Sequence, residues 1–174
     1  MEDVRYPIGK FSPIDNANEE QINSFINQLE RQPVIARQSI EGLSEEQIGT
    51  PYRPEGWTVR QVIHHIADAN INAYSRFKIA LTEDEPTIKL WDEVTWAELE
   101  DSRKAPVELS LAILDAIHAR WSILLRSLRI ADFKRKLIHP QMGKMALSDC
   151  IQFYVWHGNH HVAQVQSFRD RMHW

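Results

Sequence analysis

Residues 50–78 read TPYRPEGWTVRQVIHHIADANINAYSRFK, and they divide at Thr58 into a turn-rich connection and a long amphipathic segment. Prolines and a glycine break regular structure before Thr58, whose hydroxyl suits the N-cap of a helix. Apolar residues then recur at helical spacing, which predicts a helix that reaches about Thr82 and buries one face. That face is formed by Val59, Val62, Ile66, Ala69, Ala73 and Phe77.

The rest of the chain predicts three more long helices. They run from about Ala17 into the low forties, from Pro106 to about Leu128, and from Leu147 to Met172. Pro33 lies inside the first of them and is expected to kink or interrupt it, because proline lacks the N–H donor and clashes with the preceding turn. Four helices in 174 residues predict an all-α four-helix bundle, folded as one domain over residues 1–174.

The predicted helices are joined by connections of very different length. Residues 44–47, SEEQ, form a capping-box pattern that predicts a short helical turn. Residues 83–105 contain Pro86, several acidic residues and two tryptophans, and we expect a long crossover with a short helix inside it. Residues 133–146 contain a proline and a glycine, and they are expected to form a small hairpin or an irregular loop before the last helix.

Composition and charge exclude several classes of protein. The net charge is −4, so no basic excess points to nucleic acid or to an anionic membrane surface. No stretch approaches the roughly 20 apolar residues that a membrane span needs, and the N-terminal MEDVRYPIGKFSPID lacks the pattern of a secretory signal. The single cysteine, Cys150, cannot form an internal disulfide, which favours a reducing compartment. We therefore expect a cytoplasmic protein without a nucleic-acid or membrane partner.

The predicted last helix contains three histidines, in YVWHGNHHVAQV at residues 154–165. At about 100° per residue, His157 and His161 lie about 40° apart on one margin of the apolar face. His160 falls roughly 165° from the centre of that face and is expected to be solvated. His157 and His161 are separated by one helical turn, a spacing that allows two imidazoles to bind one ion.

The helix that begins at Thr58 repeats this arrangement with the doublet His64-His65. His65 lies at the edge of the apolar face, whereas His64 points about 170° away from its centre. His65 is therefore a candidate third ligand, since three neutral imidazoles with one open position form a known catalytic zinc site. Gly158 follows His157, so the glutamate base of the HExxH motif is missing and a thermolysin-like protease is not expected. The alternative is a chance HxxxH motif of solvated or hydrogen-bonded histidines.

The other candidate side chains are assigned structural roles. His118 lies in the middle of the apolar face of the third helix and is expected to be a buried, hydrogen-bonded core residue. Asp68 points away from the apolar face and is expected to be solvated. Cys150 is expected to be a buried small apolar side chain. His139 and His173 have no convergent partner that the sequence can show.

Four blocks of the sequence resemble the YfiT-like proteins of the DinB superfamily. The blocks are RYPIGKF at residues 5–11, the stretch at residues 50–78, HARWSILLRSL at residues 118–128, and FYVWHGNHHVAQV at residues 153–165. The resemblance implies a four-helix bundle with up-down-down-up order, a homodimer, and one divalent ion per chain, usually zinc or nickel. The ligands of this family are the second His of the HH doublet and both His of the C-terminal HxxxH. They fall here on His65, His157 and His161.

The reaction stays open at this point. Three neutral ligands leave the full charge on the ion, and such an ion activates either a water molecule or a thiol. The family has been described both as metal-dependent hydrolases and as bacillithiol S-transferases, so the resemblance implies a small-molecule substrate, in the second case a low-molecular-weight thiol. Two alternatives are not catalytic. One is a bundle that binds a metal or metabolite without turnover, and the other is a structural bundle with histidines at a dimer face.

Overall fold

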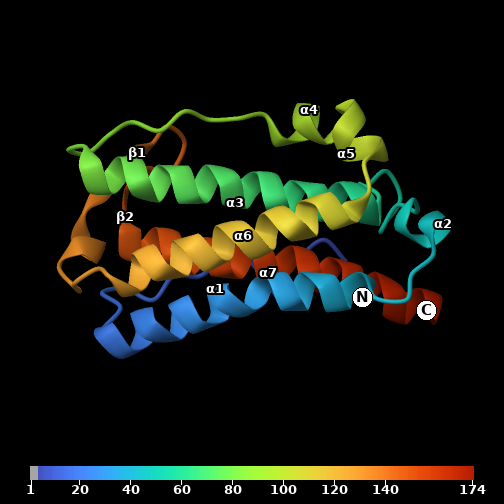
Figure 1. Ribbon diagram of the computed structural model, residues 1–174, viewed down its shortest axis with the longest axis horizontal. Coiled ribbons are helices and arrows are strands. Elements are labelled where there is room, and N and C mark those ends of the chain that lie inside the picture. Colours follow the sequence, from blue (N-terminus) through green and yellow to red (C-terminus); the bar gives the residue numbers. More distant parts are fainter. Residues whose placement is uncertain (1–3) are drawn as a thin grey trace.

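The computed structural model describes residues 4–174, and residues 1–3, the start of the stretch searched for a secretory signal, lie outside the described part. Within that part, the long helices pack as a four-helix bundle (Figure 1). They are α1 (Glu19–Ile40), α3 (Val59–Thr82), α6 (Val107–Arg126) and α7 (Leu147–Met172). Helices α1 and α7 run in one direction and α3 and α6 in the other, so the predicted up-down-down-up order is confirmed (Figure 1).

The long crossover follows from this order of the helices. Because α3 and α6 are parallel neighbours, the chain must return along the bundle before α6 can begin (Figure 1). Two short helices lie in the crossover, where the sequence predicted one. They are α4 (Glu93–Ala97) and α5 (Glu100–Lys104), and both pack against α3. Earlier in the crossover, the Ile88 N–H donates to the Ile138 carbonyl at 3.0 Å.

Side-chain caps fix where several of the helices start. Asn18, Ser44 and Thr58 each accept a hydrogen bond from the backbone N–H of the glutamine three residues later, and each glutamine side chain accepts one in return. At Thr58, the Gln61 N–H donates to the hydroxyl oxygen at 3.2 Å, and the Thr58 N–H donates to Gln61 Oε1 at 2.9 Å. Ser44 starts the short helix α2 (Glu45–Ile48), as predicted.

Helix α1 continues through Pro33, so the predicted interruption does not occur. Proline supplies no N–H to the carbonyl four residues earlier, which is that of Leu29. His118 on α6 provides the missing donor, because its Nδ1 lies 2.7 Å from the Leu29 oxygen. A side chain from a neighbouring helix therefore satisfies the carbonyl that Pro33 leaves free.

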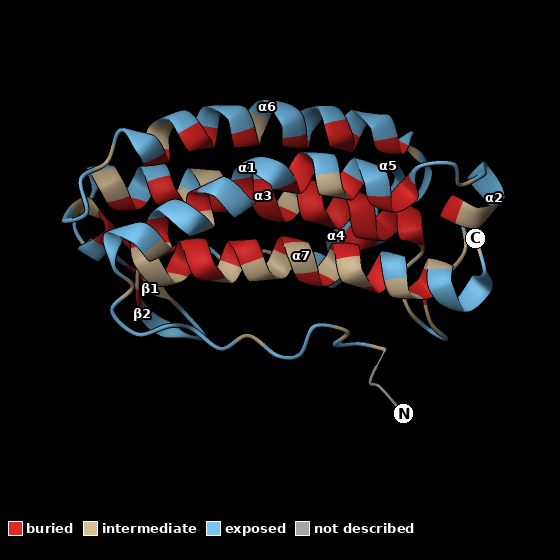
Figure 2. Cartoon of the chain, turned by 90° about the horizontal axis from the view of Figure 1, so that it is seen from below, coloured by how far each residue is buried: buried red, intermediate tan, exposed pale blue. Residues whose placement is uncertain are grey.

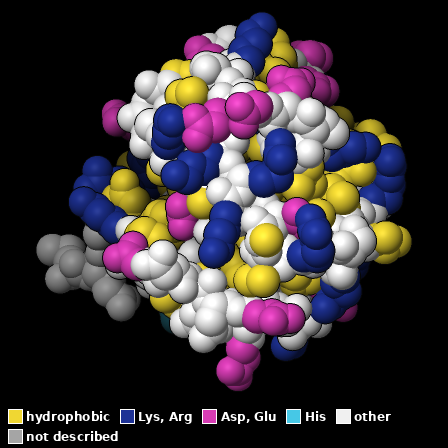
Figure 3. Space-filling view, turned by 90° about the vertical axis from the view of Figure 1, so that its left-hand side faces the viewer, with side chains coloured by type: hydrophobic (Ala, Val, Ile, Leu, Met, Phe, Trp, Pro, Cys, Tyr) yellow, Lys and Arg dark blue, Asp and Glu magenta, His cyan; other side chains and the backbone are white. Residues whose placement is uncertain are grey.

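The segment before α7 is the predicted hairpin. It follows the 3-10 turn η1 (Asp132–Lys134) and consists of β1 (Lys136–His139) and β2 (Gly143–Ala146), paired antiparallel. Gly143 has φ +77°, a conformation that favours glycine. Basic and acidic side chains are interspersed on this end of the bundle (Figure 3). Lys144 pairs there with Glu85 of the crossover.

The core consists of two apolar clusters along the bundle. On α7 one cluster extends to Val155 and the other begins at Val162, which leaves the HxxxH segment between them. The N-terminal segment before α1 runs along the outer side of α7 (Figure 2). Its Ile14 N–H donates to Gln152 Oε1 at 2.8 Å, and the ring of Phe11 packs edge-on against Phe153. None of the helices described in residues 4–174 has the length and apolar character of a membrane span.

Candidate metal centre

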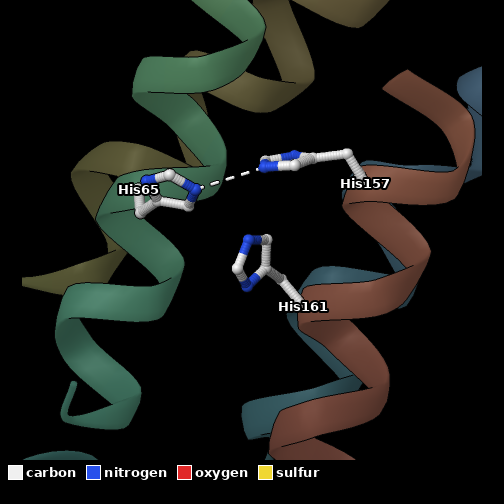
Figure 4. Close-up of side chains that lie close together, drawn as sticks. All are labelled: His65, His157 and His161. Atoms are coloured by element: carbon white, nitrogen blue, oxygen red, sulfur yellow. Dashed lines mark hydrogen bonds between the residues drawn. The ribbon is translucent and has the colours of Figure 1, made fainter. Parts of the chain in front are cut away.

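Three imidazoles meet between α3 and α7 (Figure 4). His65 comes from α3, and His157 and His161 come from successive turns of α7. One ligand-type atom from each ring lies within 4.8 Å of the others. The Nε2 atoms of His65 and His157 are 3.2 Å apart, and His161 points a nitrogen toward both (Figure 4). The structure thus brings together the three residues that the sequence selected.

The separation of His65 and His157 fits a divalent ion. Tetrahedral zinc with Zn–N bonds of about 2.0–2.1 Å places two ligand nitrogens about 3.3 Å apart, close to the separation between His65 and His157. In His161, Nδ1 donates to Gln164 Oε1 at 2.9 Å, which leaves Nε2 without a proton and available to an ion. Gln164 was not among the residues predicted for the site, although it follows His161 by three residues and therefore shares its face of the helix.

Burial keeps all three rings neutral, which is the form that binds metals. It lowers the pKa of His65, His157 and His161 well below the usual 6.5, and each ring further lowers the pKa of a neighbouring ring by charge repulsion. The Nδ1 atoms of His65 and His157 are buried without a hydrogen-bond partner among the described residues. The Nε2 atoms of the same two rings face each other, so the neutral imidazoles that converge here form a set of ligands for a cation.

Tryptophans surround His65. The ring of Trp57, from the connection before α3, lies 4.7 Å from the His65 ring between centroids. Trp91, from the crossover, stacks on His65 at 5.6 Å with an interplanar angle of 27°, and Trp96 packs against Trp91 at 4.8 Å. The crossover tryptophans, whose role could not be assigned from the sequence, therefore hold the His65 ring in place.

A cavity of about 380 Å³ borders the three imidazoles. His157 and His161 are half-buried and face this space, whereas His65 is 6% exposed. The wall is aromatic near the histidines and polar further away. Beyond the histidines it is lined by Trp57, Ala69, Arg76, Leu90, Trp91, Glu93, His139, Gln141, Met142, Phe153 and Tyr154. The cavity volume suits a small organic substrate.

The expectation that His160 is solvated was wrong. His160 is only 6% exposed, and its ring stacks on Trp156 at 4.8 Å with an interplanar angle of 17°. Its Nε2 accepts a hydrogen bond from Gln164 Nε2 at 3.0 Å, and the ring of Tyr6 lies 5.6 Å away. The N-terminal segment covers this side of α7, so the helix has two buried faces.

His64 is also buried, at 5% exposure, although its position on the helix predicted an outward side chain. Its Nδ1 lies 2.7 Å from the Ser110 hydroxyl and its Nε2 lies 3.1 Å from the Ala105 carbonyl. The end of the crossover and α6 therefore enclose the face of α3 opposite the cavity. His64 is a structural residue of that contact.

The structure also places four other side chains that the sequence singled out. His118 and Cys150 are buried as predicted, and burial raises the pKa of the Cys150 thiol to about 12. Asp68 is half-buried rather than solvated, and burial together with the charge of Asp101 raises its pKa to about 6. His139 lines the cavity, a placement that no local sequence signal indicated.

Gly158 marks a close contact between α1 and α7. A Cβ atom at this position would lie 2.5 Å from Nε2 of Gln32, which is buried and donates to the Val155 carbonyl at 2.8 Å. A side chain as large as glutamate has no room here. The missing HExxH glutamate thus has a steric cause, because the position after His157 faces α1 and not the cavity.

The comparisons with known proteins agree with this geometry. Residues 28–165 match the family model of the DinB superfamily. Proteins of Bacillus mycoides and Bacillus cereus, each named "putative metal-dependent hydrolase", are 47% and 48% identical over 174 residues, the full length of each chain. The solved structure of YfiT from Bacillus subtilis, described as "a probable metal-dependent hydrolase with an unusual four-helix bundle topology", is 43% identical. It covers 98% of both chains with a TM-score of 0.96. The chain therefore belongs to the DinB superfamily.

Proposed function

We propose that this protein is a metal-dependent hydrolase of small molecules. One divalent ion would be held by the Nε2 atoms of His65, His157 and His161. Zinc is the first candidate for this ion and nickel the second. The observation that carries the proposal is the convergence of three neutral imidazoles at the wall of a cavity. The names of the full-length relatives in Bacillus support the same reaction class.

The ion and the residues around it would have separate roles in catalysis. A divalent ion with three neutral ligands lowers the pKa of bound water toward 7 and polarises a substrate carbonyl. Gln164 holds the His161 tautomer by accepting from Nδ1, and Trp57 and Trp91 fix the His65 ring. The aromatic wall excludes water around the substrate, which strengthens electrostatic interactions in the cavity.

Elemental analysis of single variants tests the ligand assignment. We expect about one divalent ion per chain in the purified wild-type protein and in His64→Gln, which changes the neighbouring buried histidine. His65→Ala, His157→Ala and His161→Ala should each lose the ion while keeping helical circular dichroism. Equal metal content in all of these proteins would rule out the proposed centre.

Thiol transfer is a second candidate, and one observation favours it. Among the described residues that line the cavity, Glu93 alone carries a carboxylate, and it lies on the exposed rim. A thiol that binds a metal ion loses its proton without a general base, so the absence of an enclosed carboxylate suits an S-transferase acting on a low-molecular-weight thiol. The loaded protein should be incubated with a thiol and a bimane electrophile, and separately with esters and amides. Metal-dependent thioether formation without hydrolysis would select the transferase.

We further expect the enzyme to act in the cytoplasm as a homodimer. The single, buried Cys150 agrees with a reducing compartment. Analytical ultracentrifugation of the loaded protein should give about twice the chain mass of 20.3 kDa. A monomer at micromolar concentration would contradict the expected dimer and would leave the metal centre unaffected, because all three histidines belong to one chain.

A further inference from the structure

One wall of the cavity carries hydrogen-bond donors apart from the three imidazoles. Arg76 on α3, Tyr154 on α7 and His139 at the end of β1 line this wall. The Arg76 Nη1 donates to the Tyr154 hydroxyl oxygen at 2.9 Å, and Nη2 donates to the Lys89 carbonyl at 3.1 Å. A guanidinium has five N–H donors, so most of its donors remain available to a ligand.

Arg76 also lacks a carboxylate partner within residues 4–174. Some arginines of the described residues pair with carboxylates, for example Arg37 with Asp115 and Arg126 with Glu30, and both pairs lie at the surface. Arg135 and Arg169, like Arg76, donate to backbone carbonyls instead. Arg76 is half-buried, and its hydrogen bonds go to uncharged oxygens. A partly desolvated guanidinium without a counter-ion is costly unless a ligand supplies the negative charge.

Tyr154 and His139 add two neutral donors beside Arg76. Tyr154 is 8% exposed, and its hydroxyl oxygen accepts from Arg76, so its own proton can be donated to a ligand. In His139, Nδ1 accepts from the backbone N–H groups of Gln141 and Met142 at 3.3 and 3.2 Å, which puts the proton on Nε2. Burial, with the charge of Arg76, lowers the pKa of His139 and keeps this ring neutral.

We propose that Arg76, assisted by Tyr154 and His139, binds a carboxylate of the substrate. The substrate is then a small anionic molecule whose carboxylate lies away from its reacting group. A guanidinium favours a carboxylate because its planar N–H groups can form two parallel, charge-assisted bonds. This inference rests on the proposed function, since the reacting group would lie at the three imidazoles, and it adds the chemical class of the substrate.

Paired hydroxamates of equal size test the inference by calorimetry on the metal-loaded protein. One probe is the monohydroxamate of succinic acid, and the other carries a primary amide in place of the free carboxylate. The hydroxamate group binds the metal in both, so their affinities differ only through the second group. We expect the carboxylate probe to bind the wild type about tenfold or more tightly, as charge-assisted hydrogen bonds predict. Two further pairs of probes, with chains one and two methylenes longer, test other distances between the hydroxamate and the carboxylate.

Variants locate the source of this preference. In Arg76→Gln the two probes should bind about equally, with the affinity of the amide probe unchanged, and Arg76→Lys should recover part of the preference. Lys78→Gln removes one positive charge from an exposed side chain of the same helix and should keep the full preference. Circular dichroism checks that each variant is folded. Equal binding of both probes by the wild type, or a preference that survives Arg76→Gln, would refute the carboxylate site.

A metal-free experiment separates this inference from the proposed function. Succinate and succinamide are compared by ligand-observed NMR with protein treated with a chelator. Selective binding of succinate that disappears in Arg76→Gln supports the carboxylate site whether or not a metal is bound. If the purified wild type holds no divalent ion, the proposed function fails, and this comparison still decides the role of Arg76.

Discussion

The side-chain amide of Gln164 contacts His161, His160 and the N-terminal segment. Its Oε1 accepts from His161 Nδ1 at 2.9 Å, while its Nε2 donates to His160 Nε2 at 3.0 Å and to the Arg5 carbonyl at 2.9 Å. Because the amide nitrogen serves His160 and Arg5, the amide oxygen must face His161. The orientation of Gln164 therefore determines which nitrogen of His161 is free to bind a metal.

Gln164→Leu should weaken metal binding by about 10- to 100-fold, because residues that orient a ligand have effects of this size. Gln164→Glu keeps an acceptor for His161 and should stay close to the wild type. Competition with a chromophoric chelator measures the affinity of each variant for zinc. A wild-type affinity in Gln164→Leu, with the helical circular dichroism retained, would show that the hydrogen bond does not orient His161.

His118 makes the stability of the protein depend on pH. Burial, opposed by the hydrogen bond to Leu29, lowers its pKa to about 4. Between pH 6.5 and 4 the unfolded chain binds a proton that the folded state does not, so stability is complete above pH 6.5 and falls as the pH decreases. The full loss is on the order of 3 kcal/mol, from 1.36 kcal/mol for each pKa unit.

Urea unfolding of metal-free protein at pH 7 and pH 5 tests this assignment. His118→Gln keeps a donor for the Leu29 carbonyl but does not titrate. Its free energy of unfolding should therefore fall by roughly 2 kcal/mol less than that of the wild type over this interval. The other histidines titrate in both proteins and cancel in the comparison. An equal loss in the two proteins would mean that His118 is protonated in the folded state.

At the scale of single elements, the contact of α1 with α7 depends on Gly158. Glycine inside an exposed helix is usually less favourable than alanine by about 1 kcal/mol. Here a Cβ atom would meet the buried amide of Gln32, which cannot move without losing its bond to the Val155 carbonyl. Gly158→Ala should therefore destabilise the fold, by about 1–3 kcal/mol, in spite of its higher helix propensity.

A second substitution shows whether the clash is the cause. In the background Gln32→Ala, the space next to residue 158 is free, and Gly158→Ala should become neutral or stabilising. Chemical denaturation of the two single variants and the double variant gives the coupling free energy. Additive effects would mean that the two helices do not meet at this point.

The sequence predicted α3 and α7 with correct ends, yet it placed His64 and His160 in solvent. A helical wheel assumes one buried face, and that assumption selected His65, His157 and His161, which the structure brings together. The faces that carry His64 and His160 are buried by the end of the crossover and by the N-terminal segment. Neither segment has the long amphipathic pattern of a bundle helix, so their packing was not predictable from the local sequence.

Arg76 and His139 were missed for a related reason. They lie 63 positions apart, on α3 and at the end of the hairpin, and they line one cavity only because the crossover and β1 pair through Ile88 and Ile138. The spacing of an HxxxH motif indicates that its two histidines can bind one ion. A single arginine on a helix has no such spacing to indicate its role. Ligand pairs within one helix are therefore predictable from sequence, and cavity walls built from distant segments are not.

At the scale of the whole molecule, the three histidines join antiparallel helices at the boundary of the two apolar clusters. The fold brings these imidazoles together, with the Nε2 atoms of His65 and His157 3.2 Å apart, so the three-nitrogen site exists in the folded state alone. An ion that binds the folded state and not the unfolded chain adds RT ln(1 + [L]/Kd), about 4 kcal/mol at 1,000 times Kd. Metal removal should thus lower the melting temperature by roughly 10 °C for a chain of this size.

Differential scanning calorimetry before and after chelation measures this shift, and added zinc should reverse it. His157→Ala provides the matched control. It cannot complete the three-nitrogen site, so its melting temperature should respond little to chelator or zinc. The shift should also increase with the logarithm of free zinc, because the stabilisation follows mass action. A melting temperature that is independent of metal in the wild type would mean that no ion joins α3 and α7, and that the bundle is stabilised by its apolar clusters alone.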